Sequence, residues 1–149
     1  MRKIGLALLG MIVVLSALSV PVVSGQPNKP LRLGLVMDLY FTDPLHWEGA
    51  VTGDIEGTII VTEGMPSFPG KTEHFFETFV ITTTGGDTIQ GYDEGVWSFQ
   101  TFKWRANGGI TSATGAWAGL VGCKVHEIGM TTPLGAEVNA WGTIAIVHG

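Results

Sequence analysis

The chain has 149 residues, a formal net charge of −5 and a single cysteine. All thirteen acidic residues but only six of the eight Lys and Arg lie beyond residue 25, which gives that part a formal charge of −7. Such an acidic surface repels phosphate backbones, so nucleic acid is not expected as a partner. One cysteine cannot form an internal disulfide. Strand packing must therefore hold the fold together, with homo-oligomerisation as a further source of stability.

The first 25 residues, MRKIGLALLGMIVVLSALSVPVVSG, have the layout of a secretory signal peptide. Arg2 and Lys3 precede an uncharged apolar run, and a small-residue cleavage site follows at 23–25. The alternative is an uncleaved membrane anchor, because residues 4–23 approach the roughly 20 apolar residues that span a bilayer. Under either interpretation the domain is exported, to the periplasm or the cell exterior. No other membrane contact is expected.

A short linker at 26–30 is expected to lead into one all-β domain at 31–149. Segments rich in Thr, Val, Ile, Phe and Trp alternate there with glycine-rich turns, and no window keeps a helical period. NGG at 107–109 predicts a hairpin turn. Strands are expected at 31–41, at 46–63 as one or two strands, at 72–84, at 88–106 as two strands broken near Asp93-Glu94-Gly95, over CKVHEIGMTT, and over the final AEVNAWGTIAIVHG.

About seven or eight short strands with short turns predict an antiparallel sandwich or a closed barrel. Closure into a barrel removes exposed strand edges. That suits a chain with few charged strand residues to protect such edges.

The stretch ATGAWAGLVGCKV at 113–125 predicts a structural corner between two strands. Glycine tolerates the positive φ of a sharp turn, and Trp117 would plug the barrel end. Gly119 and Gly122 would then let the backbone pass close beneath the Trp117 ring. The residues that define the corner are Thr114, Gly115, Trp117, Leu120 and Gly122.

The same corner contains Cys123, for which two interpretations are open. It is either an ordinary buried residue at the start of a strand or a nucleophile. A reactive thiol needs a cationic environment, but alternation sends Lys124 and His126 to the opposite face of the strand. The structural interpretation is therefore favoured.

The spacing of this corner resembles the Thr/Ser-Gly-x-aromatic-x-x-Ala-x-Gly corner of allene oxide cyclases and dirigent proteins. FETFVITTTGGDTIQG and the closing AEVNAWGTIAIVHG also look like parts of that barrel, so the likeness covers residues 72–149. The resemblance implies a closed antiparallel eight-stranded barrel. Its apolar lumen steers a reactive substrate in the cyclases and orients radicals made elsewhere in the dirigent proteins. The catalytic groups of the cyclases lie on early strands, and residues 31–63 carry no matching motif, so none is transferred.

Acidic residues on strands are the candidates for chemistry inside such a lumen. Glu77 shares a face with Phe75 and Phe79, where an apolar environment would raise the pKa of a carboxyl group. Pairing with Lys103 or Arg105 is the alternative. The candidate lumen cluster is Asp54, Glu77, Cys123 and Glu127, with Asp54 otherwise simply solvated. The candidate ligand-contacting aromatics are Phe75, Phe79, Trp97, Phe99 and Trp141.

The four histidines, at 46, 74, 126 and 148, lack the spacing of metal ligands, so neither a metal nor a cofactor is expected. Three functions are consistent with the sequence. The first is an exported barrel that binds a small apolar or amphipathic molecule. The second is an isomerase, cyclase or dirigent-type steering protein. The third is a structural or interaction barrel whose interior is filled by side chains.

Overall fold

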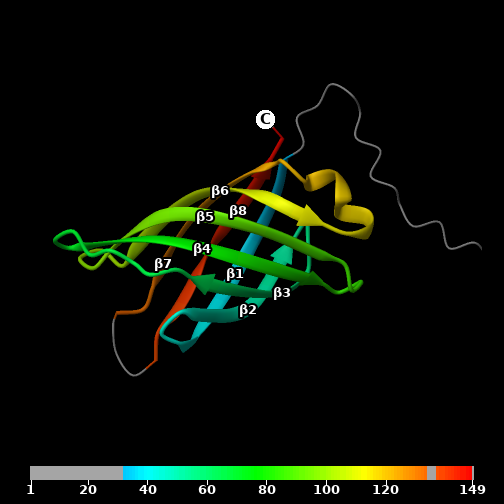
Figure 1. The fold of residues 1–149 in the computed structure, drawn as a ribbon. Coiled ribbons are helices and arrows are strands. Elements are labelled where there is room, and N and C mark those ends of the chain that lie inside the picture. The colour runs from blue at the N-terminus through cyan, green and yellow to red at the C-terminus, as the bar shows by residue number, and fades with distance from the viewer. Residues whose placement is uncertain (1–31, 134–136, 149) are drawn as a thin grey trace, which may run out of the picture.

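The structure, a computed structural model, describes residues 32–133 and 137–148. In this part of the chain, eight antiparallel strands form one closed barrel in which each strand pairs with its neighbours in sequence. The barrel is closed by pairing of the first strand with the last, as Figure 1 shows. The predicted all-β closed barrel is thus confirmed. The predicted signal peptide and linker lie outside the described residues.

The elements follow one another with short connections. They are β1 (Arg32–Asp43), β2 (His46–Gly53), β3 (Gly57–Glu63), β4 (Thr72–Thr83), β5 (Thr88–Ser98), β6 (Lys103–Ala113), the 3₁₀-helix η1 (Gly115–Leu120), β7 (Lys124–Thr131) and β8 (Asn139–Val147).

Two expectations about strand boundaries are wrong. β5 runs unbroken through Asp93-Glu94-Gly95, and the turn comes later, where Phe102 adopts a φ of 56°. The expected hairpin turn at 107–109 lies instead inside β6, paired with both β5 and β7. Glycine serves close packing at these positions: a Cβ on Gly108 would overlap the backbone of Tyr92 and Asp93.

The two ends of the barrel differ. The β2–β3 and β4–β5 turns and η1 lie at one end, where η1 is the yellow coil in Figure 1. The β1–β2, β3–β4 and β5–β6 connections lie at the other end, because antiparallel strands alternate their turns between the two ends. We call these the η1 end and the open end.

Side-chain alternation places the apolar core inside the barrel, as the pleat of a strand requires. On β1, Leu35, Met37 and Leu39 are buried, whereas the residues between them are exposed. The most deeply buried side chains come mainly from β-branched residues that suit strands. The β-branched residues in this set are Val51, Ile55, Ile59, Ile81, Ile89, Val125, Ile144 and Ile146.

The corner at 113–125 forms the η1 helix and is a structural element. Gly115 and Gly122 have φ of 53° and 86°, as expected for the two sharp turns. Leu120 is the buried plug, and Trp117 is half-buried against the core. The expected close approach at Gly119 and Gly122 is absent, since a Cβ there would meet nothing within 4 Å.

Candidate functional site

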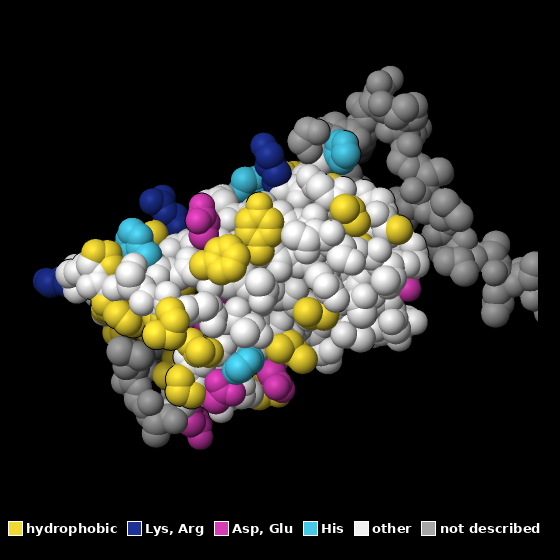
Figure 2. Space-filling model, in the orientation of Figure 1, with side chains coloured by type: hydrophobic (Ala, Val, Ile, Leu, Met, Phe, Trp, Pro, Cys, Tyr) yellow, Lys and Arg dark blue, Asp and Glu magenta, His cyan; other side chains and the backbone are white. Residues whose placement is uncertain are grey.

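The open end of the barrel leads into a cavity of about 390 Å³. Its walls combine apolar and aromatic side chains with a few acids. Figure 2 shows hydrophobic side chains gathered at this end of the molecule, away from η1. The β3–β4 connection, which lies at this end, carries Met65 and Phe68, and these side chains are 90% and 60% exposed. The cavity is therefore a chamber that opens at one end of the barrel, next to the packed apolar core.

Aromatic pairs connect the segments around the entrance. Phe68, on the β3–β4 connection, stacks on Phe99 of the β5–β6 turn with ring centroids 6.1 Å apart. Phe99 in turn meets Trp97 edge-on at 5.1 Å, and Phe41 meets Trp47 edge-on at 5.0 Å. These contacts hold an aromatic rim at the open end.

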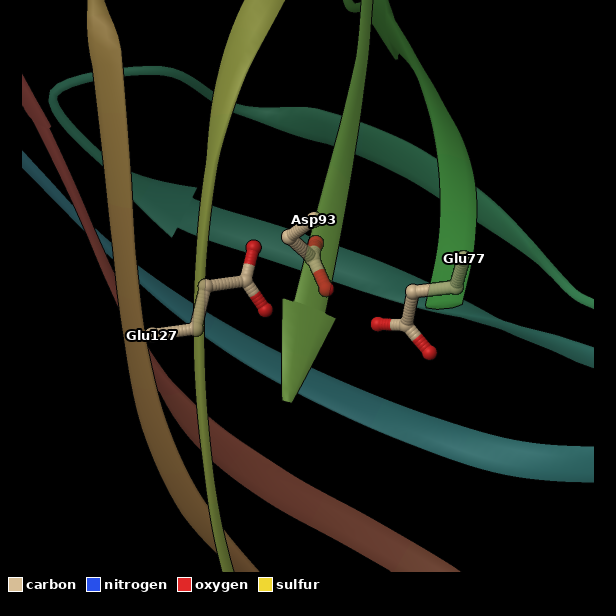
Figure 3. A group of neighbouring side chains, drawn as sticks. All are labelled: Glu77, Asp93 and Glu127. Carbon is tan, nitrogen blue, oxygen red and sulfur yellow. The ribbon is translucent and has the colours of Figure 1, made fainter. Parts of the chain in front are cut away.

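Three carboxyl groups converge deeper in the barrel, one from each of three strands. Glu77 on β4, Asp93 on β5 and Glu127 on β7 each place an oxygen within 4.8 Å of the other two. In Figure 3 the three side chains point toward one another. Asp93 is fully buried and Glu127 is 4% exposed. Glu77 and Glu127 also line the cavity, so this acid cluster is in contact with it.

The register of the sheet explains this convergence. Glu77 and Asp93 are direct partners across the β4–β5 ladder. β6 separates Asp93 from Glu127, and its inward positions there are the small residues Ala106 and Gly108. Since these residues present no side chain longer than a methyl group, the carboxyl groups from β5 and β7 can approach each other across β6.

The surroundings of the acid cluster favour the neutral form of each carboxyl group. Burial, with the nearby Asp93, Glu127 and Glu63 carboxyls, raises the pKa of Glu77 well above its ordinary value. Burial raises the pKa of Asp93 to about 7, against a smaller lowering by Glu77. Burial and the neighbouring Asp93 likewise raise the pKa of Glu127 well above its ordinary value. Protons are therefore retained here at a pH where free carboxyls have lost theirs.

A second acidic pair lines the same cavity. Glu63 at the end of β3 lies near Glu73 on β4, and Glu73 is 8% exposed. Burial, followed by the effect of Glu73, raises the pKa of Glu63 to about 8. Five carboxyl groups thus lie in or beside one small chamber.

No basic side chain balances these acids among the described residues that line the cavity. Lys103 and Arg105, the partners considered for Glu77, are exposed and border a groove on the outer surface of β5–β8. Alternation along β6 turns them away from the lumen, so the expected alternative of a Glu77–Arg105 pair is absent.

Several polar atoms in this region are buried without a hydrogen-bond partner. They include both carboxylate oxygens of Asp93, the indole Nε1 of Trp97 and the hydroxyl Oγ1 of Thr131. Trp97 and Thr131 both line the cavity, and Thr131 is only 5% exposed. Buried polar groups are ordinarily satisfied, so each of these atoms is free to bind a ligand or a water molecule.

The sequence predicted a lumen cluster of three acids and one thiol, namely Asp54, Glu77, Glu127 and Cys123. The structure brings only Glu77 and Glu127 of these together. Asp54 is exposed in the β2–β3 turn at the η1 end, where its Oδ2 accepts a hydrogen bond of 2.7 Å from the Gly34 amide. Cys123 is buried in the core, with its Sγ 3.7 Å from Nδ1 of His148. Burial raises the pKa of this thiol, which disfavours the nucleophilic thiolate.

The five candidate aromatics also divide by location. Phe75 and Trp97 line the cavity, and Phe99 supports Trp97 at the rim. Phe79 is 2% exposed in the core below the cavity. Trp141 lies outside the barrel, 42% exposed, because the neighbouring Ala140 takes the inward position on β8.

Sequence reasoning missed Asp93, Glu63 and Glu73. Asp93 was assigned to a turn on the strength of its neighbours Glu94 and Gly95. In a hairpin, residues at equal numbers of positions before and after the turn lie opposite each other. Counting residues outward from the β4–β5 turn in this way pairs Asp93 with Glu77. Glu63 and Glu73 flank the proline-containing β3–β4 connection. Each lies two positions from an apolar strand residue, Val61 or Phe75, and this two-residue spacing indicates that the acids face the lumen.

This arrangement can perform three kinds of chemistry. Buried protonated carboxyls with raised pKa can donate or accept a proton near neutral pH. Three carboxylates at this spacing can hold a hard divalent cation, which prefers oxygen ligands. Acids lined by aromatics can also bind an organic cation. Neither a metal nor a cation was expected from the sequence.

No helix in the described part of the chain has the length and apolar character needed to cross a membrane. Comparison of the chain with protein-family models, with curated proteins and with solved structures gives no match.

Proposed function

We propose that the protein binds one small amphipathic molecule in the barrel lumen. The observation that carries the proposal is the cavity of about 390 Å³, with aromatic walls and converging polar groups. Ligand sites in proteins are commonly concave and mostly apolar, with volumes of roughly 300–1,000 Å³ and few polar groups. The apolar part of the ligand would lie against the aromatic walls, and its polar part would reach the acids.

Binding is tested by uptake of an apolar fluorescent probe and by native mass spectrometry of protein purified from its own host. We expect a bound small molecule, or saturable uptake of the probe. Trp97→Ala should weaken probe binding about tenfold, because it removes a large apolar contact from the wall. Trp141→Ala is the matched control, since that tryptophan lies on the outer surface. An empty protein that excludes the probe would instead favour a structural barrel with a filled interior.

A second candidate function is an isomerase, cyclase or dirigent-type steering protein, in keeping with the resemblance to allene oxide cyclases and dirigent proteins. The observation in its favour is the group of buried carboxyls, among them Asp93 with a pKa of about 7. Such a group can act as general acid or base at neutral pH. Once a ligand is identified, Glu77→Gln and Glu127→Gln should each abolish its conversion while leaving the fold intact. Unchanged turnover in both variants would remove this candidate.

The proposed setting is outside the cytoplasm, and the sequence pattern of a signal peptide at residues 1–25 supports it. Expression of the full chain in its host, followed by N-terminal sequencing of the exported product, tests this. A start shortly after Gly25 would support cleavage. An intact N-terminus in the membrane fraction would support the anchored alternative.

A further inference from the structure

We propose that the lumen selects organic cations, namely small amphipathic amines whose ammonium group lies among Glu77, Asp93 and Glu127. The apolar body of the amine would then occupy the aromatic part of the cavity. This inference rests on the proposed binding function and names the chemical class of its ligand.

The charge balance of the chamber is the first argument. Five carboxyl groups lie in or beside it, and the described residues that line it include no Lys, Arg or His. Buried charges in proteins are paired or neutralised. Protonation neutralises these acids when the chamber is empty. Once they are ionised, the described lining offers no positive charge, so a cationic ligand would supply the stabilising partner.

The geometry of the acid cluster is the second argument. An ammonium group has three hydrogen-bond donors, and the three acids approach from three different strands with oxygens within 4.8 Å of one another. Asp93, which is fully buried, receives no hydrogen bond on either oxygen from any group outside the acid cluster. A primary ammonium group placed between the three side chains in Figure 3 would supply donors to each of them.

The walls of the cavity are the third argument. Phe75, Trp97 and Trp104 line the chamber that the acids adjoin. Aromatic faces attract cations and pack against apolar bodies. Thr131, 5% exposed and without a partner for its hydroxyl, offers a further contact to a polar substituent on the ligand. An amine with an aromatic or aliphatic body matches both parts of the cavity.

A consequence of this arrangement is that binding an amine should release protons. The carboxyl groups of the acid cluster retain protons when the cavity is empty. A bound ammonium group lowers their pKa values, so the carboxyls ionise and release protons to the solvent. The remaining strands present non-ionisable side chains to the cavity, among them Met37 on β1, Trp47 on β2, Trp104 on β6 and Ala140 on β8. Within the described part of the chain, the titratable groups that face the cluster or the cavity are all acids: Glu63 on β3, Glu73 and Glu77 on β4, Asp93 on β5 and Glu127 on β7.

The experiment compares tryptamine with tryptophol, which share an indole ring and differ in an ammonium or hydroxyl head group. Isothermal titration calorimetry of each with the wild-type protein at neutral pH should show a preference for tryptamine of about 10- to 100-fold, the usual effect of charged hydrogen bonds. Titration in two buffers of different ionisation enthalpy should show proton release with tryptamine and none with tryptophol.

The variant E77Q/D93N/E127Q should lose the preference for tryptamine while keeping its affinity for tryptophol. E94Q is the matched control, because Glu94 follows Asp93 on β5 but faces the solvent. Urea unfolding of each variant establishes that it folds. The wild-type preference and the proton release need no variant, so they test the inference even if the triple variant fails to fold.

Equal binding of both compounds, or tryptamine binding without proton release, would overturn the inference and leave the proposed function standing. Stoichiometric binding of Ca²⁺ or Mn²⁺ that excludes tryptamine would also overturn it, by assigning the cluster to a metal ion. Exclusion of both indoles and of the apolar probe would overturn the inference and the proposed function together.

Discussion

Glu77 and Asp93 lie directly opposite each other on β4 and β5, with both carboxyl groups inside the barrel. Cross-strand neighbours of like charge destabilise a sheet. This pair is tolerated because burial keeps the carboxyls protonated at a pH where exposed acids are ionised. The stability of the empty protein is therefore coupled to proton binding at this pair.

The free energy of unfolding of the empty protein should fall as the pH rises from weakly acidic to weakly alkaline. Asp93 has its pKa raised from 3.8 to about 7, and Glu63 from 4.5 to about 8. The folded state thus holds protons that the unfolded chain has released. This contribution is complete below the unfolded pKa and is lost as the pH rises through the folded pKa, with a slope of about 1.4 kcal/mol per pH unit for each such proton.

Urea denaturation over this pH range measures the effect. Asp93→Asn should reduce the slope, and the exposed neighbour Glu94→Gln should leave it unchanged. A stability that rises with pH across the range would contradict the assignment of these groups as protonated in the folded state.

Gly108→Ala should destabilise the barrel, because a Cβ at this position would overlap the carbonyl oxygen of Tyr92 and crowd Asp93. Backbone atoms of a paired strand cannot move aside without breaking the ladder. A loss of about 1–3 kcal/mol, typical of overpacking, is expected in urea denaturation. Gly119→Ala is the control, since a Cβ there meets nothing within 4 Å. Equal stability of the two variants would argue against the close β5–β6 packing.

Leu120→Ala should destabilise the protein by about 2–5 kcal/mol, the usual cost of truncating a buried leucine. Leu120 is 4% exposed and closes the η1 end, whereas the next residue, Val121, is 51% exposed. Val121→Ala should therefore have little effect. Probe binding by folded Leu120→Ala should match that of wild type, because the cavity opens at the opposite end. A loss of binding would mean that the two ends communicate.

Cys123 should react slowly with a thiol reagent such as Ellman's reagent while the protein is folded. The side chain is 1% exposed and burial raises its thiol pKa, so both access and thiolate population are reduced. In urea the same thiol should react at the rate of a free cysteine. Rapid labelling of the folded protein would revive the nucleophile interpretation.

Much of the barrel could be predicted from local pattern, and the site only in part. Alternation along single strands placed Glu77 beside Phe75 and predicted the interior position of Glu127. These inferences need only the two-residue period of a strand. The glycine-rich corner was also recognisable, because positive φ at Gly115 and Gly122 is a local requirement.

The missed parts depend on contacts between strands. Gly95 suggested a turn, but it lies within β5. A glycine fits this strand position because the ring of Phe75 and the backbone of Arg105 occupy the space a Cβ would need. That error concealed Asp93. The outward orientation of Trp141 follows from the face that β8 turns to the core, which a count of aromatic residues does not reveal.

The pairing of β1 with β8 has a consequence for biosynthesis. Residues 32–40 of β1 and 139–147 of β8 form the seam of the barrel, so the outer edges of these two strands are protected only when they meet. A growing chain that lacks residues 139–147 would leave β1 and β7 as unpaired edges open to aggregation. Closure of the barrel therefore has to wait until residues 139–147 have been synthesised, and until then the edges of β1 and β7 depend on other protection.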